Sequence, residues 1–233
     1  MALSPARDMA RSDVIHPGEP VTVNRYTMPA RINHWVTAIS LILLAISGLA
    51  LFHPSLYFLT ALFGGGQLTR ILHPWIGVVM FLSFGGLFFR FWRLNLWKRS
   101  DSAWIGKPGT VISGREEGLP EVGKYNAGQK LYFWGMSITI LILFVTGIVA
   151  WEQYFGDRFT VEQKRMGVLL HAAAAIVAIC LWIVHVYAAI WVRGTISAMT
   201  RGKVTGGWAW RHHRRWLRDI VSGKPDPGKT GKK

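Results

Sequence analysis

The run from Met166 to Val192 constrains the fold of this chain more than any other stretch. Its 27 residues include no Asp, Glu, Lys or Arg, and about 20 apolar residues are enough to cross a bilayer as a helix. The run nevertheless contains two histidines, His171 and His185, and ionisable side chains inside a membrane are candidate functional residues because they are costly to bury. Their separation of 14 residues is ~3.9 helical turns, which places both imidazoles near one face and ~21 Å apart along the axis. In a hydrocarbon core ~30 Å thick, one histidine therefore falls near each membrane surface.

Two interpretations of these histidines compete. Two stacked haems would need one histidine near each surface on a single stripe of a helix, since imidazole is a standard axial ligand of haem iron. The alternative is that each histidine only donates a hydrogen bond to another helix. The haem interpretation requires two partner histidines from other helices at matching depths.

Charged and apolar stretches alternate along the chain. The 233 residues include 27 Lys and Arg against 12 Asp and Glu, a net charge of +15, and these charges are crowded between long apolar runs. This distribution is typical of a multi-pass membrane protein with basic connections, and it argues against a nucleic-acid-binding protein. The predicted spans are Val36–Phe52 with an extension toward Arg31, Ile71–Phe89, Leu131–Trp151 and Met166–Val192.

We therefore expect an all-α membrane protein, a four-transmembrane-helix bundle that holds two haems. Residues 1–28 are expected to form a polar N-terminal segment, 29–200 the transmembrane domain and 201–233 a basic tail. Pro74 stands at the mouth of the second span. Because proline is tolerated in the first turn of a helix, we expect Pro74 to mark the start of that helix.

The distribution of Lys and Arg predicts the orientation in the membrane. The N-terminal segment, the connection Leu94–Lys130 and the tail are basic, whereas the connection between the first two spans has only Arg70. The connection Glu152–Arg165 has nearly balanced charges. By the positive-inside rule, both termini are expected on the cytoplasmic side of a bacterial inner membrane, in contact with its lipids.

This topology pairs four histidines by depth. His34 opens the first span on the cytoplasmic side, and His73 opens the second span on the outer side. His73 should therefore meet His171 at an outer haem, and His34 should meet His185 at an inner haem. Facing helices of a four-helix bundle commonly build such sites. The sequence thus predicts two b-type haems, each with two histidine ligands to its iron.

The remaining candidates have weaker signals. Arg31 and Arg70 each precede a predicted ligand by one helical turn and could hold haem propionates, although anchoring to lipid headgroups explains them equally well. Cys180 is expected to be a small buried apolar side chain, and a single cysteine excludes an iron–sulfur cluster on this chain. Histidines 53, 212 and 213 are expected on solvated or headgroup-facing surfaces.

Five segments resemble one known family. They are RINHW (31–35), RILHP (70–74), EVGKYNAGQK (121–130), LLHAAA (169–174) and WVRGTI (191–196). They resemble the gamma, or cytochrome b, subunit of membrane-bound, quinone-linked formate dehydrogenase, and the resemblance extends from about Arg31 to Trp216. It implies an iron–sulfur beta subunit as partner and, through it, an alpha subunit that oxidises formate at molybdenum or tungsten. It also assigns the same two pairs of haem ligands, and it leaves a higher oligomer of the complex open.

The resemblance also implies a quinone site at Asn126, Gly128 and Gln129, just before the third span. A polar loop at membrane depth can hydrogen-bond a quinone oxygen, but Asn is also a favoured N-cap, so these residues could simply cap the helix. In this interpretation the chain is the electron-transfer and quinone-reducing subunit of a formate:quinone oxidoreductase. It would carry no formate-oxidising site of its own.

Two other functions remain open at the level of sequence. The cytochrome b subunit of a hydrogenase or of a thiosulfate/polysulfide reductase would share the four-helix, two-haem plan. A redox-silent membrane anchor or transporter belongs to a different class, and a transporter would be expected to have acidic residues or broken helices at mid-membrane. The spans contain no carboxylates there, which argues against transport.

Overall fold

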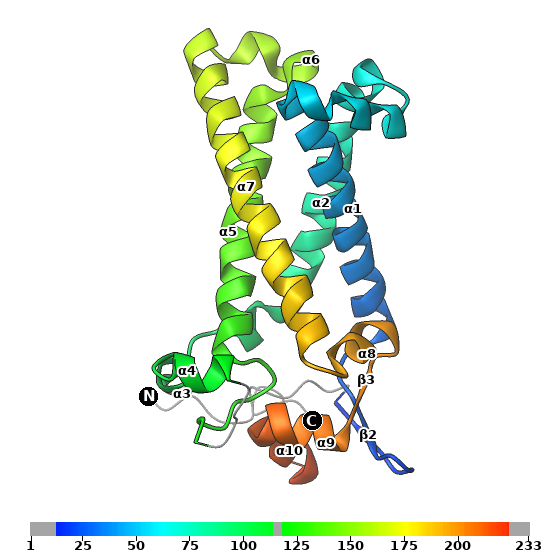
Figure 1. The fold of residues 1–233 in the computed structure, drawn as a ribbon, viewed down its shortest axis with the longest axis vertical. Coiled ribbons are helices and arrows are strands. Elements are labelled where there is room, and N and C mark those ends of the chain that lie inside the picture. The colour runs from blue at the N-terminus through cyan, green and yellow to red at the C-terminus, as the bar shows by residue number, and fades with distance from the viewer. Residues whose placement is uncertain (1–12, 114–117, 224–233) are drawn as a thin grey trace, which may run out of the picture. The chain divides into compact units, whose positions relative to one another are not determined.

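The computed structural model describes residues 13–113 and 118–223, and four of the described helices are long and apolar enough to cross a membrane. They are α1 (Met28–Phe52), α2 (Gly66–Phe91), α5 (Ala127–Ala150) and α7 (Val161–Trp191). Their number and order agree with the predicted spans, and each begins a few residues earlier than its apolar run. Figure 1 shows the four helices side by side. The chain is thus a mostly helical, multi-pass membrane protein.

The expectation that Pro74 marks the start of the second transmembrane helix is wrong. Helix α2 begins at Gly66, so Pro74 lies in its interior. The preceding turn is made by Gly64 and Gly65, whose φ values of 82° and 101° suit glycine. The polar residues after this turn, Gln67, Thr69 and Arg70, already belong to the helix. Hydropathy alone does not reveal this.

One compact unit, here called the helix unit, consists of Ile32–Phe89 and Gly135–Val186. Its helices are joined by close contacts, of which the tightest ring contact stacks Phe81 of α2 on Phe144 of α5 with ring centres 3.8 Å apart. Most of its large apolar side chains are exposed, as expected for helices that face lipid. The unit also contains the short helices η2 (Pro54–Phe63), α6 (Glu152–Phe155) and η4 (Gly156–Arg158).

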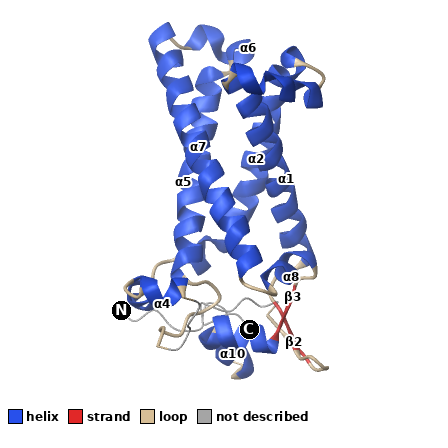
Figure 2. Ribbon diagram, in the orientation of Figure 1, coloured by secondary structure: helices blue, strands red, loops and turns tan. Residues whose placement is uncertain are grey.

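The other unit, here called the terminal unit, consists of the described residues within Met1–Arg31, Arg90–Trp134 and Tyr187–Lys233. It contains a three-stranded antiparallel sheet in the order β1-β2-β3, and Figure 2 shows β2 and β3 beside each other. The strands are β1 (Ile15–His16), β2 (Thr22–Asn24) and β3 (Lys203–Thr205), and the short helices are η3 (Trp92–Asn95), α3 (Arg99–Ile105), α4 (Pro108–Ile112), α8 (Thr195–Thr200), α9 (Gly206–His212) and α10 (Arg214–Val221). Val23, Val204, Trp208 and Trp216 belong to its core.

The expectation of an all-α fold therefore misses one small sheet. Strands of two or three residues are too short for an alternating pattern of side chains to reveal them. Val23 pairs with Val204, so the sheet depends on a contact between the two ends of the chain.

Candidate functional site

The structure brings four of the eight histidines together as two facing pairs within the helix unit. His34 of α1 faces His185 of α7, with ring centres 6.3 Å apart and ring planes at 45°. His73 of α2 faces His171 of α7, with ring centres 6.2 Å apart and ring planes at 68°. These are the pairs that the topology predicts, and each pair is made by two different helices.

The spacing of each pair suits one iron ion between two imidazoles. A ring nitrogen binds a metal at about 2 Å and lies roughly 1 Å from the centre of its ring, so two rings on opposite sides of one ion are about 6 Å apart. The observed separations are 6.3 Å and 6.2 Å. Among residues 13–113 and 118–223, no cluster of three or more His, Cys, Asp or Glu could hold a metal by side chains alone. Two histidines are the donor set that a haem needs, because the porphyrin supplies the remaining ligands.

The His73–His171 pair is supported by two buried hydroxyl groups. Ser47 Oγ of α1 lies 2.7 Å from His73 Nδ1, and Thr146 Oγ1 of α5 lies 3.0 Å from His171 Nδ1. With Nδ1 engaged on each ring, Nε2 is the nitrogen available to a metal. Each histidine of this pair is therefore oriented by a neighbouring helix.

A glycine follows each of these hydroxyl residues and lies against the histidine ring. A Cβ atom on Gly48 would lie 3.3 Å from His73 Cε1, and a Cβ atom on Gly147 would lie 3.4 Å from His171 Cε1. These residues were missed by sequence reasoning. The sequence pattern that could have revealed them is a hydroxyl residue followed by glycine. Ser47 stands 26 residues before His73, and Thr146 stands 25 residues before His171.

The surroundings of His34 differ from those of His73. Nδ1 of His34 is buried and has no hydrogen-bond partner among the described residues. The neighbouring Asn33 accepts a hydrogen bond of 2.6 Å from Ser83 Oγ of α2. A Cβ atom on Gly86 would lie only 2.7 Å from Asn33 Nδ2, so Gly86 permits this close contact of α1 with α2.

The two arginines predicted to hold propionates lie in different settings. Arg31 donates a hydrogen bond of 2.5 Å to the carbonyl oxygen of Thr200, so part of its guanidinium binds the chain itself. Arg70 is exposed on the second turn of α2. A role for either arginine at a propionate stays a prediction.

The proposed quinone residues form a cap at the start of α5. The Asn126 backbone N–H donates to Gln129 Oε1 at 3.1 Å, and the Gln129 backbone N–H donates to Asn126 Oδ1 at 2.9 Å. These two reciprocal hydrogen bonds form a capping box, so Asn126 and Gln129 do cap the helix. The cap uses the amide oxygens and leaves the amide N–H groups as donors. Gly128 is exposed and both amide side chains are partly exposed, so the start of α5 could still bind a ligand.

A family model described as prokaryotic cytochrome b561 matches residues 25–202 of the chain. The chain belongs to this family. It is 46% identical over 199 residues to the formate dehydrogenase cytochrome b556(fdo) subunit of Escherichia coli K12, a match that covers 85% of this chain and 93% of that subunit. It is 42% identical over 187 residues to the nitrate-inducible formate dehydrogenase cytochrome b556(Fdn) subunit of the same strain, covering 80% and 86% of the two chains.

A third relative agrees with these two. The formate dehydrogenase cytochrome b556 subunit of Haemophilus influenzae is 37% identical over 215 residues, covering 89% of this chain and 90% of that one. Membership of a cytochrome b family implies that the chain binds b-type haem. The resemblance inferred from the five short segments is confirmed.

Two buried ion pairs hold the first turn of α5 and the segment before it in this cytochrome b561 family member. Lys124 Nζ lies 2.6 Å from Asp13 Oδ1, and Lys130 Nζ lies 2.7 Å from Asp101 Oδ2, with all four side chains at most 2% exposed. Burial lowers the pKa of Lys124 to about 8, although Asp13 opposes this shift. Sequence reasoning counted these lysines among the charges of a hydrophilic connection. Asp13 precedes the part of the chain that the family model matches.

The expectation that His213 lies on a solvated surface is wrong. Only 1% of His213 is exposed, and its Nδ1 lies 2.7 Å from the carbonyl oxygen of Gly123. A carbonyl oxygen only accepts, so Nδ1 carries the proton and Nε2 can accept from Arg25 Nη2 at 3.3 Å. The other hydrogen bond of Arg25 Nη2 goes to the carbonyl oxygen of Lys124 at 2.6 Å. Burial, followed by the charge of Arg25, holds the pKa of His213 well below its ordinary value.

The lowered pKa of His213 predicts that the folded terminal unit loses stability in acid. Below pH ~6.5 the unfolded histidine binds a proton that the folded one does not, so this group destabilises the fold by up to ~1.4 kcal/mol for each further pH unit. The slope should become shallower in His213→Asn, which keeps an N–H for Gly123. Urea unfolding between pH 5 and 7.5 measures it. The exposed His53→Asn variant should retain the wild-type slope, and an unchanged slope in His213→Asn would refute the assignment.

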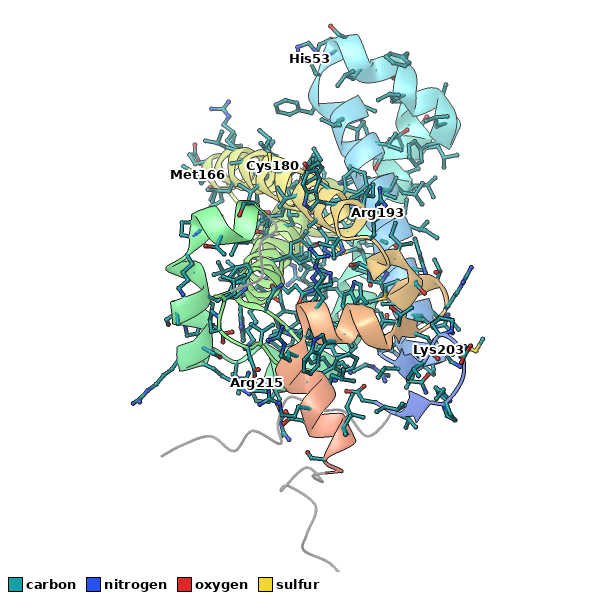
Figure 3. The ribbon with its side chains drawn as sticks, turned by 60° about the horizontal axis from the view of Figure 1, so that its bottom comes forward. His53, Met166, Cys180, Arg193, Lys203 and Arg215 are labelled. Carbon is teal, nitrogen blue, oxygen red and sulfur yellow. The ribbon has the colours of Figure 1, made fainter. Side chains whose placement is uncertain are left out.

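Two further sequence expectations can be compared with the structure. Cys180 is exposed on α7, so its expected burial is wrong. Figure 3 labels this residue on the helix. The side-chain period of a fully apolar helix does not reveal which face points outward. His53 is exposed, and its Nδ1 accepts a hydrogen bond of 3.2 Å from the Ser55 backbone N–H, which confirms its predicted surface position.

Proposed function

We propose that this chain is the cytochrome b subunit of a formate dehydrogenase complex and that it delivers electrons to a quinone. The observation that carries the proposal is the presence of two histidine pairs, each at the spacing that one haem iron requires. Three relatives whose names describe formate dehydrogenase cytochrome b556 subunits support the choice of complex. They favour it over a hydrogenase or a thiosulfate/polysulfide reductase.

The four histidines would hold two b-type haems at different depths. His171 and His185 are separated by 14 residues of α7, which is ~21 Å along the helix axis. Bound there, the haems would supply one-electron redox chemistry between an iron–sulfur partner and the quinone. The basic connections support an orientation with both termini cytoplasmic in a bacterial inner membrane, the His73–His171 pair on the outer side and the His34–His185 pair on the inner side.

The quinone is proposed to bind at Asn126, Gly128 and Gln129. The amide N–H groups that the capping box leaves available can donate to a quinone oxygen, and Gly128 exposes the backbone beside them. The buried ion pairs of Lys124 and Lys130 hold residues 124–130 at both ends, so the donors need little ordering when a ligand binds. Quinone reduction here would take its protons from the cytoplasmic side.

The partners follow from the proposed complex. They are an iron–sulfur beta subunit and, through it, an alpha subunit that oxidises formate at molybdenum or tungsten. Arg31 and Arg70 are proposed to interact with haem propionates, because a guanidinium pairs well with a carboxylate. An anchor or transporter without redox function would be supported if the purified chain bound no haem.

Gln129→Ala is expected to slow quinone reduction without removing haem. In the purified complex, formate should reduce the haems at the wild-type rate, and their reoxidation by added quinone should slow about tenfold, which corresponds to the loss of one hydrogen bond of ~1.4 kcal/mol. Stopped-flow absorption of the haem bands follows both steps. Haems that formate does not reduce would contradict the proposed function.

A second capping box provides the matched control. At the start of α7, the Thr160 backbone N–H donates to Gln163 Oε1 at 2.9 Å, and the Gln163 backbone N–H donates to Thr160 Oγ1 at 3.3 Å. Gln163→Ala should therefore cost a similar ~1 kcal/mol of helix capping and leave quinone reoxidation unchanged. Equal slowing in both variants would assign the effect to lost capping and reject the quinone site.

A further inference from the structure

The hydroxyl groups of Ser47 and Thr146 lie beside the two histidines of one pair and are almost fully buried. Ser47 is 0% exposed and Thr146 is 7% exposed. Ser47 belongs to α1 and contacts His73 of α2, whereas Thr146 belongs to α5 and contacts His171 of α7. Each hydroxyl group thus comes from the long helix that stands before the histidine's helix in the sequence.

The direction of these hydrogen bonds follows from the other contacts of the hydroxyl groups. Ser47 Oγ lies 2.8 Å from the carbonyl oxygen of Leu43, and Thr146 Oγ1 lies 2.7 Å from the carbonyl oxygen of Ile142. A carbonyl oxygen only accepts, so each hydroxyl donates its single proton to the turn before it. The hydroxyl oxygens must then accept from the histidines, and the network assigns the proton of each ring to Nδ1.

We propose that Ser47 and Thr146 are positioning residues for the haem of the His73–His171 pair. This inference rests on the proposed function. By accepting from Nδ1–H, the two hydroxyl groups select the tautomer in which both Nε2 atoms have lone pairs for one iron. A hydrogen bond at the far nitrogen also makes an imidazole a stronger donor to its metal. It therefore stabilises the ferric form and lowers the reduction potential of that haem.

The glycines next to the hydroxyl residues are part of the same arrangement. Ser47-Gly48 and Thr146-Gly147 place an accepting oxygen at the nitrogen of each ring and a glycine against its Cε1 atom. A Cβ atom at Gly48, 3.3 Å from His73 Cε1, would press on that ring, whereas one at Gly147 would make an ordinary contact of 3.4 Å with His171 Cε1. The same two-residue step thus serves both ligands of one haem.

In the His34–His185 pair, a hydrogen bond to Nδ1 does not support both histidines. Nδ1 of His34 is buried without a hydrogen-bond partner in residues 13–113 and 118–223. At least one ligand of that haem therefore lacks the hydrogen bond that strengthens donation to iron. The haem at His73 and His171 should have the lower potential of the two, which favours electron flow from it toward the haem at His34 and His185.

The test is a redox titration of the two haems in the intact complex that carries Ser47→Ala or Thr146→Val. The haem of the His73–His171 pair should titrate at a higher potential than in wild type, and its affinity should fall about 10–100-fold, the usual effect of removing such a partner. The other haem should titrate as in wild type. Ser47→Thr and Thr146→Ser restore a hydroxyl group and should restore the wild-type potential.

Two matched hydroxyl residues separate ligand positioning from helix packing. Ser40 and Thr139 stand seven residues before Ser47 and Thr146, and both are 6% exposed. Thr139 Oγ1 donates to the carbonyl oxygen of Gly135 at 2.8 Å, four residues earlier in α5. Thr146 Oγ1 donates in the same way to Ile142, four residues before it. Ser40→Ala and Thr139→Val should leave both potentials unchanged.

The outcomes distinguish this inference from the function on which it rests. Two haems with unchanged potentials and affinities in Ser47→Ala and Thr146→Val would overturn the positioning role and leave the proposed function intact. Equal shifts in the Ser40 and Thr139 variants, or loss of both haems together with helix content, would assign the hydroxyl groups to helix packing and also overturn it. A wild-type complex without haem would refute the proposed function itself.

Discussion

On the proposed assignment of two haems, replacing His73 with alanine is expected to lower the haem content of the purified chain from two haems to one. The ring centres of His73 and His171 are 6.2 Å apart, so the change would leave an iron proposed to lie between them with one protein ligand. The His34–His185 pair lies ~21 Å away along α7 and would supply its own two ligands, so the haem proposed there should be retained. A reduced-minus-oxidised spectrum with haem quantified per polypeptide gives the stoichiometry. Electron paramagnetic resonance should show one low-spin ferric signal in place of two.

The histidine substitution has two controls. His53 is exposed outside the pairs, so His53→Ala should retain both haems. Free imidazole can occupy the space left in His73→Ala and should restore the second low-spin signal. Two firmly bound haems in His73→Ala would show that His73 is not a ligand. Loss of both haems from a chain with wild-type helix content would show that the two sites are not independent.

Removing the carboxylate of Asp13 is expected to destabilise the terminal unit by about 3–5 kcal/mol, the usual cost of leaving a buried charge without its partner. Asp13 accepts 2.6 Å and 2.9 Å hydrogen bonds from Lys124 Nζ and Trp216 Nε1. Asp13→Ala would therefore leave an ammonium group and an indole N–H unpaired in the interior. Urea unfolding, followed by Trp fluorescence and by proteolysis of the tail, measures the loss.

An exposed ion pair of the same unit is the matched control for Asp13. Arg218 and Glu121 are paired at 2.5 Å, and their side chains are 59% and 37% exposed. Because solvent screens such pairs, Glu121→Ala should cost ~1 kcal/mol or less. The double variant Asp13→Leu with Lys124→Met removes both buried charges and should recover most of the lost stability. A loss in Asp13→Ala no larger than that in Glu121→Ala would show that the buried pair contributes little.

Much of the candidate site could be predicted from the sequence because its geometry is nearly one-dimensional. Membrane depth follows from position along a span, and a helix converts the 14 residues between His171 and His185 into a known distance. Adding the charge bias of the connections was enough to pair each of these histidines with a partner on another helix. The structure brings together the same pairs, while their role as haem ligands stays a prediction.

Other features depend on which side chains meet and could not be predicted in this way. Asp13 and Lys124 lie far apart in the sequence, and nothing in either segment alone predicts that they form a buried pair. His213 looked like one of several cations in a basic tail, but its contact with the carbonyl oxygen of Gly123 places it in the interior. The sheet depends on Val23 and Val204 in the same way.

The sequence by itself determined the four long helices, the position of each histidine along its helix and the family of the chain, because hydropathy, helical rise and short motifs are local properties. Only the tertiary structure decided which groups surround those histidines. It placed the hydroxyl groups of Ser47 and Thr146 at the imidazole nitrogens and buried the lysines on either side of the cap at the start of α5. The physical reason is that a hydrogen bond or a buried ion pair requires a specific partner at a specific angle, and only packing of distant segments supplies it.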